Sequence, residues 1–178
     1  MNRRDFLKAG AALSASLILP GSLGAAQYEK TLKLYHRHTG EWINATFWID
    51  GEYIYEVLES LDYFLRDYRT DEIHKIDTRL IEYLYNIQRL VDFKELHIVS
   101  AYRSPRTNSL LRKHSRGVAK NSFHTKGMAA DITVPGVRLS TIKYAALSLH
   151  RGGVGYYPRS HFIHVDTGTP RYWRYPKR

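Results

Sequence analysis

The sequence predicts an α+β fold in a single domain, with a central, mostly antiparallel sheet flanked by helices. Three observations indicate this class. The 178 residues suit one ordinary domain, and a 43% hydrophobic share is enough for a packed core. Helical spacing dominates the first half of the chain, and strand patterns cluster in the second half. The two kinds of element do not alternate as they would around a parallel sheet.

The first 26 residues have the organisation of an export signal. Arg3 and Arg4 come shortly before an apolar stretch of about a dozen residues, which resembles a bacterial twin-arginine signal. A membrane-spanning helix needs about 20 apolar residues, so this stretch is too short to span a bilayer. Twin-arginine systems export folded proteins. We expect cleavage after Ala26, leaving residues 27–178 as a periplasmic domain with no stable membrane span.

In the first half of that domain, residues 31–38 and 41–49 are rich in aromatic and β-branched side chains and flank Thr39-Gly40. This arrangement predicts a β-hairpin. Asp50-Gly51 predicts the turn that follows. Apolar residues then recur at helical spacing in two stretches that we predict to be helices, residues 53–66 and 76–91.

The second half predicts two helices among short strands. Ser104-Pro105 begins a helix that runs to about Lys113, with Ser104 as the N-cap and proline at the first helical position. Ser140 is expected to cap a second helix that Gly152-Gly153 ends. The remaining segments are strands at 96–99, 129–134, 154–157 and 162–167, a polar loop at 115–122, and a tail of alternating basic and aromatic residues at 171–178.

The composition restricts the chemistry and the partners. The absence of cysteine excludes disulfides, thiolate metal ligands and a cysteine nucleophile, so any metal must be held by His, Asp or Glu. A formal charge of +10 favours a polyanionic partner such as nucleic acid, anionic lipid or an acidic cell-wall polymer. Nucleic acid is not expected as a partner, because the chain is exported and carries no nucleic-acid-binding motif.

Two stretches rich in His and Asp concentrate the possible chemistry. His124 follows a polar loop, whereas Asp131 lies inside an apolar strand, where a buried carboxylate must pair, neutralise or bind metal. His164 and Asp166 share one face of a later strand. Two histidines and one aspartate suit Zn²⁺ with a fourth position open. The alternative is a hydrogen-bonded cluster that only organises the strands. His36, in the hairpin, is expected at the surface.

These residues belong to motifs that resemble the YcbK-like branch of the LAS zinc metallopeptidases. The resemblance covers nearly all of the exported domain, in order, at residues 39–41, 66–69, 100–105, 122–124, 127, 130–132, 152–157 and 162–168. It implies a LAS-type fold, as in hedgehog and the D-Ala-D-Ala peptidases, with His124, Asp131 and His164 as zinc ligands. It also implies a zinc-dependent murein endopeptidase acting on peptidoglycan stem peptides, and the branch is associated with cross-links between two diaminopimelate residues.

The resemblance also suggests residues that handle substrate. Arg103 resembles an arginine that binds the substrate carbonyl oxygen and stabilises the developing oxyanion. Ser122 is expected either to bind substrate or to orient the His124 loop. Tyr102 is expected to line the substrate groove, together with some of the other aromatic residues Tyr156, Tyr157, Tyr172 and Trp173.

The general base has two candidates. Many LAS peptidases carry a glutamate three residues before the second histidine, and here that position is His161, which can also accept a proton. Asp166 is slightly favoured, although it can equally hold the ring of His164. Two other functions suit the same residues: a D-alanyl carboxypeptidase and a non-catalytic zinc-containing peptidoglycan-binding module. The sequence does not indicate an oligomeric state.

Overall fold

The computed structural model describes residues 28–176 except Phe93 and Arg116, so the expected signal peptide lies outside the described residues. In this part of the chain, eight strands form one sheet in the order β3-β2-β1-β4-β5-β7-β6-β8. The strands are β1 (Glu29–His36), β2 (Trp42–Ile49), β3 (Glu52–Tyr53), β4 (Leu96–Ser100), β5 (Ala129–Thr133), β6 (Gly153–Tyr157), β7 (Phe162–Asp166) and β8 (Arg171–Arg174).

The sheet is mixed and mostly antiparallel. Five of the seven neighbouring strand pairs are antiparallel, and only β1–β4 and β6–β8 are parallel. The helices are α1 (Tyr55–Phe64), α2 (Thr78–Leu90), α3 (Pro105–His114) and α4 (Leu139–Ser148), with a 3-10 turn η1 (Phe123–Lys126). The predicted α+β class is therefore confirmed.

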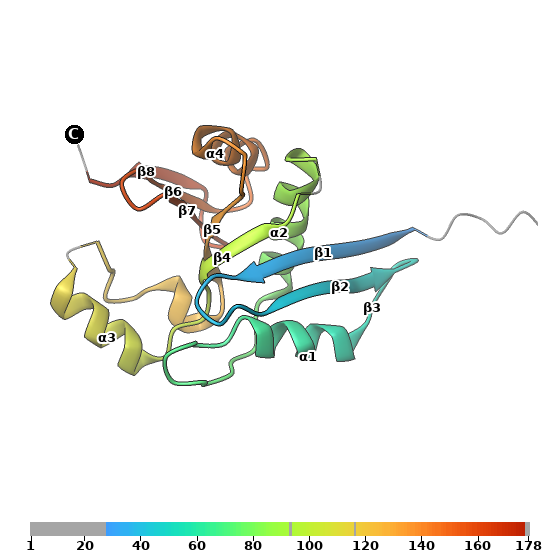
Figure 1. The fold of residues 1–178 in the computed structure, drawn as a ribbon, viewed down its shortest axis with the longest axis horizontal. Helices are drawn as coiled ribbons and strands as arrows, with labels where there is room; N and C mark the ends of the chain where they lie inside the picture. Colours follow the sequence, from blue (N-terminus) through green and yellow to red (C-terminus); the bar gives the residue numbers. More distant parts are fainter. Residues whose placement is uncertain (1–27, 93, 116, 177–178) are drawn as a thin grey trace, which may run out of the picture.

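Three helices cover the sheet around one hydrophobic core. Figure 1 shows α1 beside the β1–β2 half of the sheet and α4 beside the β5–β7 half. The helices α2 and α4 are joined by the Tyr83 hydroxyl, which donates to the Ala146 carbonyl at 2.9 Å. Helix α3 contributes no residue to this core, because its buried residues are only Thr107 and Asn108. It lies at one end of the molecule, where Leu111 of this helix and residues of the loop that follows it line a cavity (Figure 1).

Helix α3 begins as predicted, but α4 does not. The Ser104 side chain accepts a hydrogen bond from the Thr107 amide at 3.2 Å, as an N-cap does. Helix α4, in contrast, begins at Leu139 after Arg138, so the expected cap Ser140 lies inside its first turn. The helix ends at Ser148, before Gly152.

Gly152 serves a different purpose from the expected helix stop. A Cβ atom at Gly152 would lie 1.7 Å from the backbone oxygen of Asp166, so only glycine allows the chain to pass this close to β7. Strand β8 is a second departure, because the tail was not predicted to be a strand. Its alternation is between basic and aromatic residues, which is a weak strand signal, yet it pairs in parallel with β6.

His36 is fully buried at the end of β1, which corrects the expectation of a surface position. Its Nδ1 accepts from the amides of His38 and Thr39, both at 3.3 Å, and so holds the hairpin turn. Its ring packs edge-on against Phe64 and Tyr68. Because Nδ1 accepts these bonds, the proton of the neutral ring is on Nε2, for which no described residue is an acceptor.

The buried state of His36 predicts a pH-dependent stability. Burial lowers its pKa from 6.5 to about 4. Below about pH 6.5 the unfolded chain gains a proton at this residue, and the folded chain does not until about pH 4. Stability is therefore lost as the pH falls through this window. Between pH 7 and 4.5 we expect the wild type to lose about 2 kcal/mol more unfolding free energy than His36→Asn.

Urea unfolding at the two pH values measures this difference. Asparagine keeps an acceptor near the position of Nδ1 and does not titrate. The matched control is His150→Asn, at an exposed position where the backbone φ of 49° also suits asparagine. A His36→Asn protein with the same pH dependence as the wild type would show that His36 does not cause it.

Candidate metal centre

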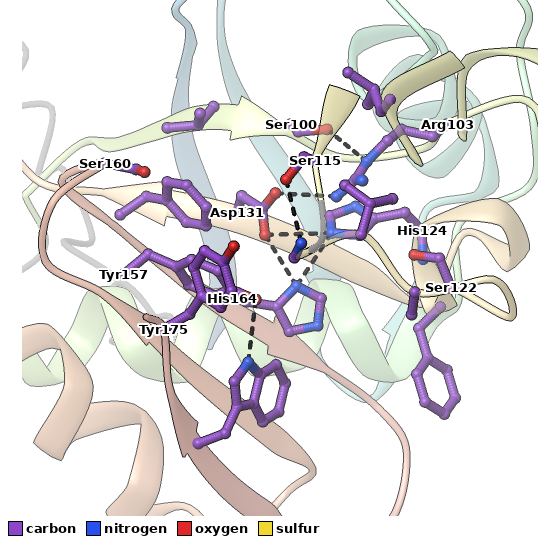
Figure 2. A pocket seen from close by; sticks show the side chains of 18 of the residues that line it. Ser100, Arg103, Ser115, Ser122, His124, Asp131, Tyr157, Ser160, His164 and Tyr175 are labelled. Carbon is purple, nitrogen blue, oxygen red and sulfur yellow. Dashed lines mark hydrogen bonds and ion pairs between the residues drawn. The ribbon is translucent and has the colours of Figure 1, made fainter. Parts of the chain in front are cut away.

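His124, Asp131 and His164 meet at the wall of a cavity of about 600 Å³ (Figure 2). His124 is carried by η1, Asp131 by β5 and His164 by β7, and the last two are direct partners across the strands. All three side chains are buried. The apolar strand thus delivers a carboxylate to a buried histidine pair, as the sequence pattern indicated.

The inner atoms of these residues form a nearly equilateral triangle. His124 Nε2 lies 3.1 Å from His164 Nδ1, and Asp131 Oδ1 lies 2.9 Å from His164 Nδ1 and 3.2 Å from His124 Nε2. Ligands about 2.0–2.1 Å from a tetrahedral Zn²⁺ are about 3.3 Å apart. The triangle therefore fits one metal ion held by three protein ligands, with a further position open.

The outer atoms of the two histidines determine their tautomers. His124 Nδ1 lies 2.6 Å from the Ala101 carbonyl oxygen, and His164 Nε2 lies 3.0 Å from Asp166 Oδ2. Both partners accept hydrogen bonds, so these outer nitrogens carry the protons. The inner nitrogens then present lone pairs toward each other and toward Asp131. Three electron-pair donors that face one point repel one another unless a proton or a metal cation lies between them, and an imidazole nitrogen with a free lone pair is the form that binds metals.

The charges around the triangle reinforce this requirement. Burial lowers the pKa of His124 to about 4, so its ring is neutral at pH 7. Burial raises the pKa of Asp131, but His124, His164 and Arg103 more than offset this and keep the carboxylate ionised. Burial lowers the pKa of His164, yet Asp131 and Asp166 raise it above its ordinary value. The negative charges of Asp131 and Asp166, which favour a proton on His164, also favour a metal cation beside it.

Asp166 lies behind His164, on the side of the ring away from the triangle. It is fully buried, and its two oxygens accept from Arg171, Gly153, Gly168 and His164 at 2.7 to 3.2 Å. Burial raises its pKa, but hydrogen bonds from His164 and Arg171 bring it well below the usual range. Of its two predicted roles, this geometry supports holding the His164 ring.

Arg103 connects the cavity to the ligand set. Its Nη2 donates to Asp131 Oδ2 at 3.1 Å, and its Nε donates to Ser100 Oγ at 3.1 Å. Its Nη1 has no hydrogen-bond partner among the described residues, which leaves donors for another molecule. Ser122 accepts from the His124 amide at 3.3 Å as the cap of η1, so it orients the His124 turn.

Tyr102 and His161 lie elsewhere. Tyr102 is buried with its hydroxyl donating to Glu72 at 2.5 Å, and it is not among the residues that line the cavity. This corrects the expectation that it lines the groove, because its hydroxyl is bound to Glu72, which does not line the cavity either. His161 is exposed in the turn between β6 and β7, with a φ of 55°, and its neighbours Ser160 and Phe162 line the cavity.

The cavity has an aromatic and cationic wall that the sequence only partly indicated. Tyr157 and Trp173 line it as expected of some aromatic residues, whereas Tyr156 and Tyr172 do not. Arg69 lines it too and is the one lining arginine without an ion pair to a described residue. Residues 66–69 form one of the motifs that resemble the family, but the motif did not predict a role for Arg69.

The comparisons with known proteins agree with this geometry. Residues 24–173 match the sequence family described as peptidoglycan L,D-endopeptidase MepK. The chain is 47% identical over 176 residues to a protein of that name from Escherichia coli, covering 97% of both chains. It is 42% identical over 178 residues to a probable peptidoglycan L,D-endopeptidase MepK from Haemophilus influenzae, covering 97% of this chain and 96% of that one.

The first residues of the chain also match a known sequence family, and this match concerns export from the cytoplasm. Residues 1–20 match the twin-arginine translocation signal sequence. This confirms that the chain is exported and periplasmic, while cleavage after Ala26 remains a prediction. Within the described residues, no helix is both long enough and apolar enough to cross a bilayer.

Because Asp166 holds the His164 ring by a hydrogen bond, we expect this residue to increase the affinity of the centre for metal. Asp166→Asn keeps the size of the side chain but cannot accept from His164 and Arg171 on both oxygens. We expect a 10- to 100-fold loss of zinc affinity, on the order typical for residues that orient a metal ligand. Competition with a chromogenic chelator measures it. The matched control is Glu95→Gln, which removes an exposed carboxylate 3.1 Å from His97. Equal affinities in both variants would contradict this role.

Proposed function

Because this chain belongs to the peptidoglycan L,D-endopeptidase MepK family, we propose that it hydrolyses a peptide cross-link of peptidoglycan with one zinc ion held by His124, Asp131 and His164. The observation that carries the proposal is the buried triangle of three electron-pair donors, with edges of 2.9 to 3.2 Å. A metal ion of this kind polarises a carbonyl oxygen and lowers the pKa of coordinated water toward 7.

The donor set supports zinc as the metal. Ca²⁺ and Mg²⁺ prefer six or more oxygen ligands, whereas two imidazole nitrogens and one carboxylate oxygen suit Zn²⁺. A site with three protein ligands is typical of catalytic rather than structural zinc, because it leaves a position for water or substrate.

The family's substrate fits the charge of the cavity. Stem peptides of peptidoglycan carry free carboxylates, and Arg69, which has no ion pair to a described residue, offers them a guanidinium on the cavity wall. This guanidinium lies over the Tyr68 ring, with its central carbon 4.1 Å from the ring centre. The bond we propose is an L,D bond, as in the description of the family, and we place it in the cross-link between two diaminopimelate residues that the resemblance of the motifs implies.

Arg103 is the residue we assign to the scissile carbonyl. Its bonds to Ser100 and Asp131 fix the guanidinium plane, and the free Nη1 can donate to the carbonyl oxygen as that oxygen gains negative charge. A guanidinium suits this role because it stays charged and carries several donors in one plane. Its contact with Asp131 also keeps that ligand oriented.

His161 is the general base we propose. The oxygens of Asp166 are already engaged by four partners, so Asp166 acts through His164 and not on water. His161 lies between two cavity-lining residues in the sequence, and a neutral imidazole nitrogen can accept a proton. Its left-handed backbone conformation is uncommon for a residue other than glycine. Catalytic hydrogen bonds often form only once substrate is bound.

Loss of a ligand should abolish both metal and turnover. We expect the mature protein, residues 27–178 loaded with zinc, to convert cross-linked muropeptide dimers in purified sacculi to monomers. His124→Ala should bind no zinc and cleave at no measurable rate, because two ligands hold zinc far more weakly than three. Chromatography with mass detection of the muropeptides, beside a chelated wild type, measures this. Cleavage that persists after zinc is removed would overturn the proposal.

The same experiment separates the other two functions. Release of terminal D-alanine without loss of dimers would identify a carboxypeptidase. Binding to sacculi with no change in any muropeptide, by the zinc-loaded wild type, would identify a binding module. The residues at the new chain ends identify the bond that is cut.

The role of His161 has its own test. We expect His161→Gln to lower kcat about 10²- to 10⁴-fold, as loss of a general base does, while zinc content and melting temperature stay unchanged. His150→Gln is the control, because this exposed histidine has the same left-handed backbone conformation. If kcat of the His161→Gln enzyme stayed within twofold of the wild-type value, His161 would not be the general base.

A further inference from the structure

Tyr157 lies on the same face of the sheet as His164. In the β6–β7 pair, Gly155 is opposite His164 and Tyr157 is opposite Phe162. Directly opposed residues share a face, as do residues two apart along a strand. The Tyr157 ring stacks on Phe162 with centroids 4.5 Å apart, and it lines the cavity of the metal centre. Its side chain therefore points toward the site where substrate is expected.

A glycine makes room for this side chain. A Cβ atom at Gly155 would lie 2.6 Å from the Trp173 ring and 2.8 Å from Tyr157 Cε2. Because position 155 has no side chain, both rings can lie over it, next to the metal ligand. The Trp173 and His164 rings are 5.3 Å apart between centroids. Any other residue at position 155 would push these two rings away from His164.

The hydroxyl of Tyr157 is held in one orientation. Trp173 Nε1 lies 3.1 Å from Tyr157 Oη, and an indole N–H can only donate (Figure 2, dashed line). The hydroxyl therefore accepts this bond and keeps its own proton for another acceptor. No described residue accepts that proton. The donated bond from Trp173 also polarises the hydroxyl and makes it a better donor.

We propose that Tyr157 is a further catalytic residue, whose hydroxyl donates a hydrogen bond to the scissile carbonyl oxygen as that oxygen becomes negative. This inference rests on the proposed function. In the view of Figure 2, Arg103 and Tyr157 lie to either side of the three ligand side chains. A carbonyl bound between them would receive a donor from each residue. Trp173 is the positioning residue for this hydroxyl.

Tyr157→Phe tests the inference, because it keeps the ring and its stacking and removes only the hydroxyl. We expect kcat on a synthetic cross-linked peptide to fall about 10²-fold, as for loss of one donor to a developing oxyanion, with KM within twofold. Zinc content and melting temperature should equal those of the wild type. Trp173→Phe should lower kcat by a smaller factor, because the hydroxyl remains but is no longer oriented.

Tyr156→Phe is the matched control. Tyr156 is the neighbouring residue on β6, does not line the cavity, and lies near Lys143 and Arg174. We expect its kcat and KM to equal those of the wild type. A Tyr157→Phe enzyme with wild-type kcat, or one that loses zinc, would overturn the proposed role.

A second readout does not depend on turnover. A phosphinate analogue of the cross-link carries anionic oxygens in the tetrahedral arrangement that the substrate reaches only during reaction. Calorimetry should give about 10²-fold weaker binding of this analogue to Tyr157→Phe than to the wild type, and unchanged binding to Tyr156→Phe. Equal binding to all three proteins would overturn the inference. Failure of the wild type to cleave sacculi would instead overturn the proposed function.

Discussion

The negative charge of Asp131 is the constraint on which the rest of this structure depends. An ionised carboxylate within an apolar strand is costly unless positive charge or donors surround it. The fold supplies Arg103 to one oxygen and two imidazoles to the other. Because both imidazoles turn their protons outward, the inner side lacks one positive charge. A metal ion would complete that balance, so the charge that these strands must accommodate also accounts for the catalytic centre that we propose.

Short contacts between backbone segments keep this arrangement rigid. Gly152, just before β6, lies against the backbone of Asp166, and Gly153, the first residue of β6, lies against the side chains of Asp166 and Arg171, so neither position has space for a side chain. That approach brings the Gly153 amide to Asp166, which holds the His164 ring through its other oxygen. The metal affinity that we propose for this centre therefore depends on glycines outside the candidate ligand set. Pre-organised outer contacts of this kind spare the ligands from reorganising when metal binds.

The three candidate metal ligands could be predicted from the sequence, whereas several of the contacts around them could not. His124, Asp131 and His164 could be identified because a carboxylate in an apolar strand is conspicuous and because their motifs resemble a known family. The partner of His124 could not, since it is the backbone oxygen of Ala101, and every residue has one. The direction of Tyr102 and the burial of His36 depend on neighbours far along the chain. The strand at 171–174 lacked the apolar alternation that marks most strands.

That last strand has a consequence for when the site is complete. Strand β8 brings Trp173 beside His164, and Arg171 at its start binds Asp166, so two residues that follow all three candidate ligands in the sequence complete the surroundings of His164. Ribosomal synthesis makes these two residues after the three candidate metal ligands. The surroundings of His164 therefore cannot be complete when the ligands themselves have just been made. A pathway that exports folded proteins suits such a chain. Both the binding of metal and the folding of the residues that surround the cavity can then take place before translocation.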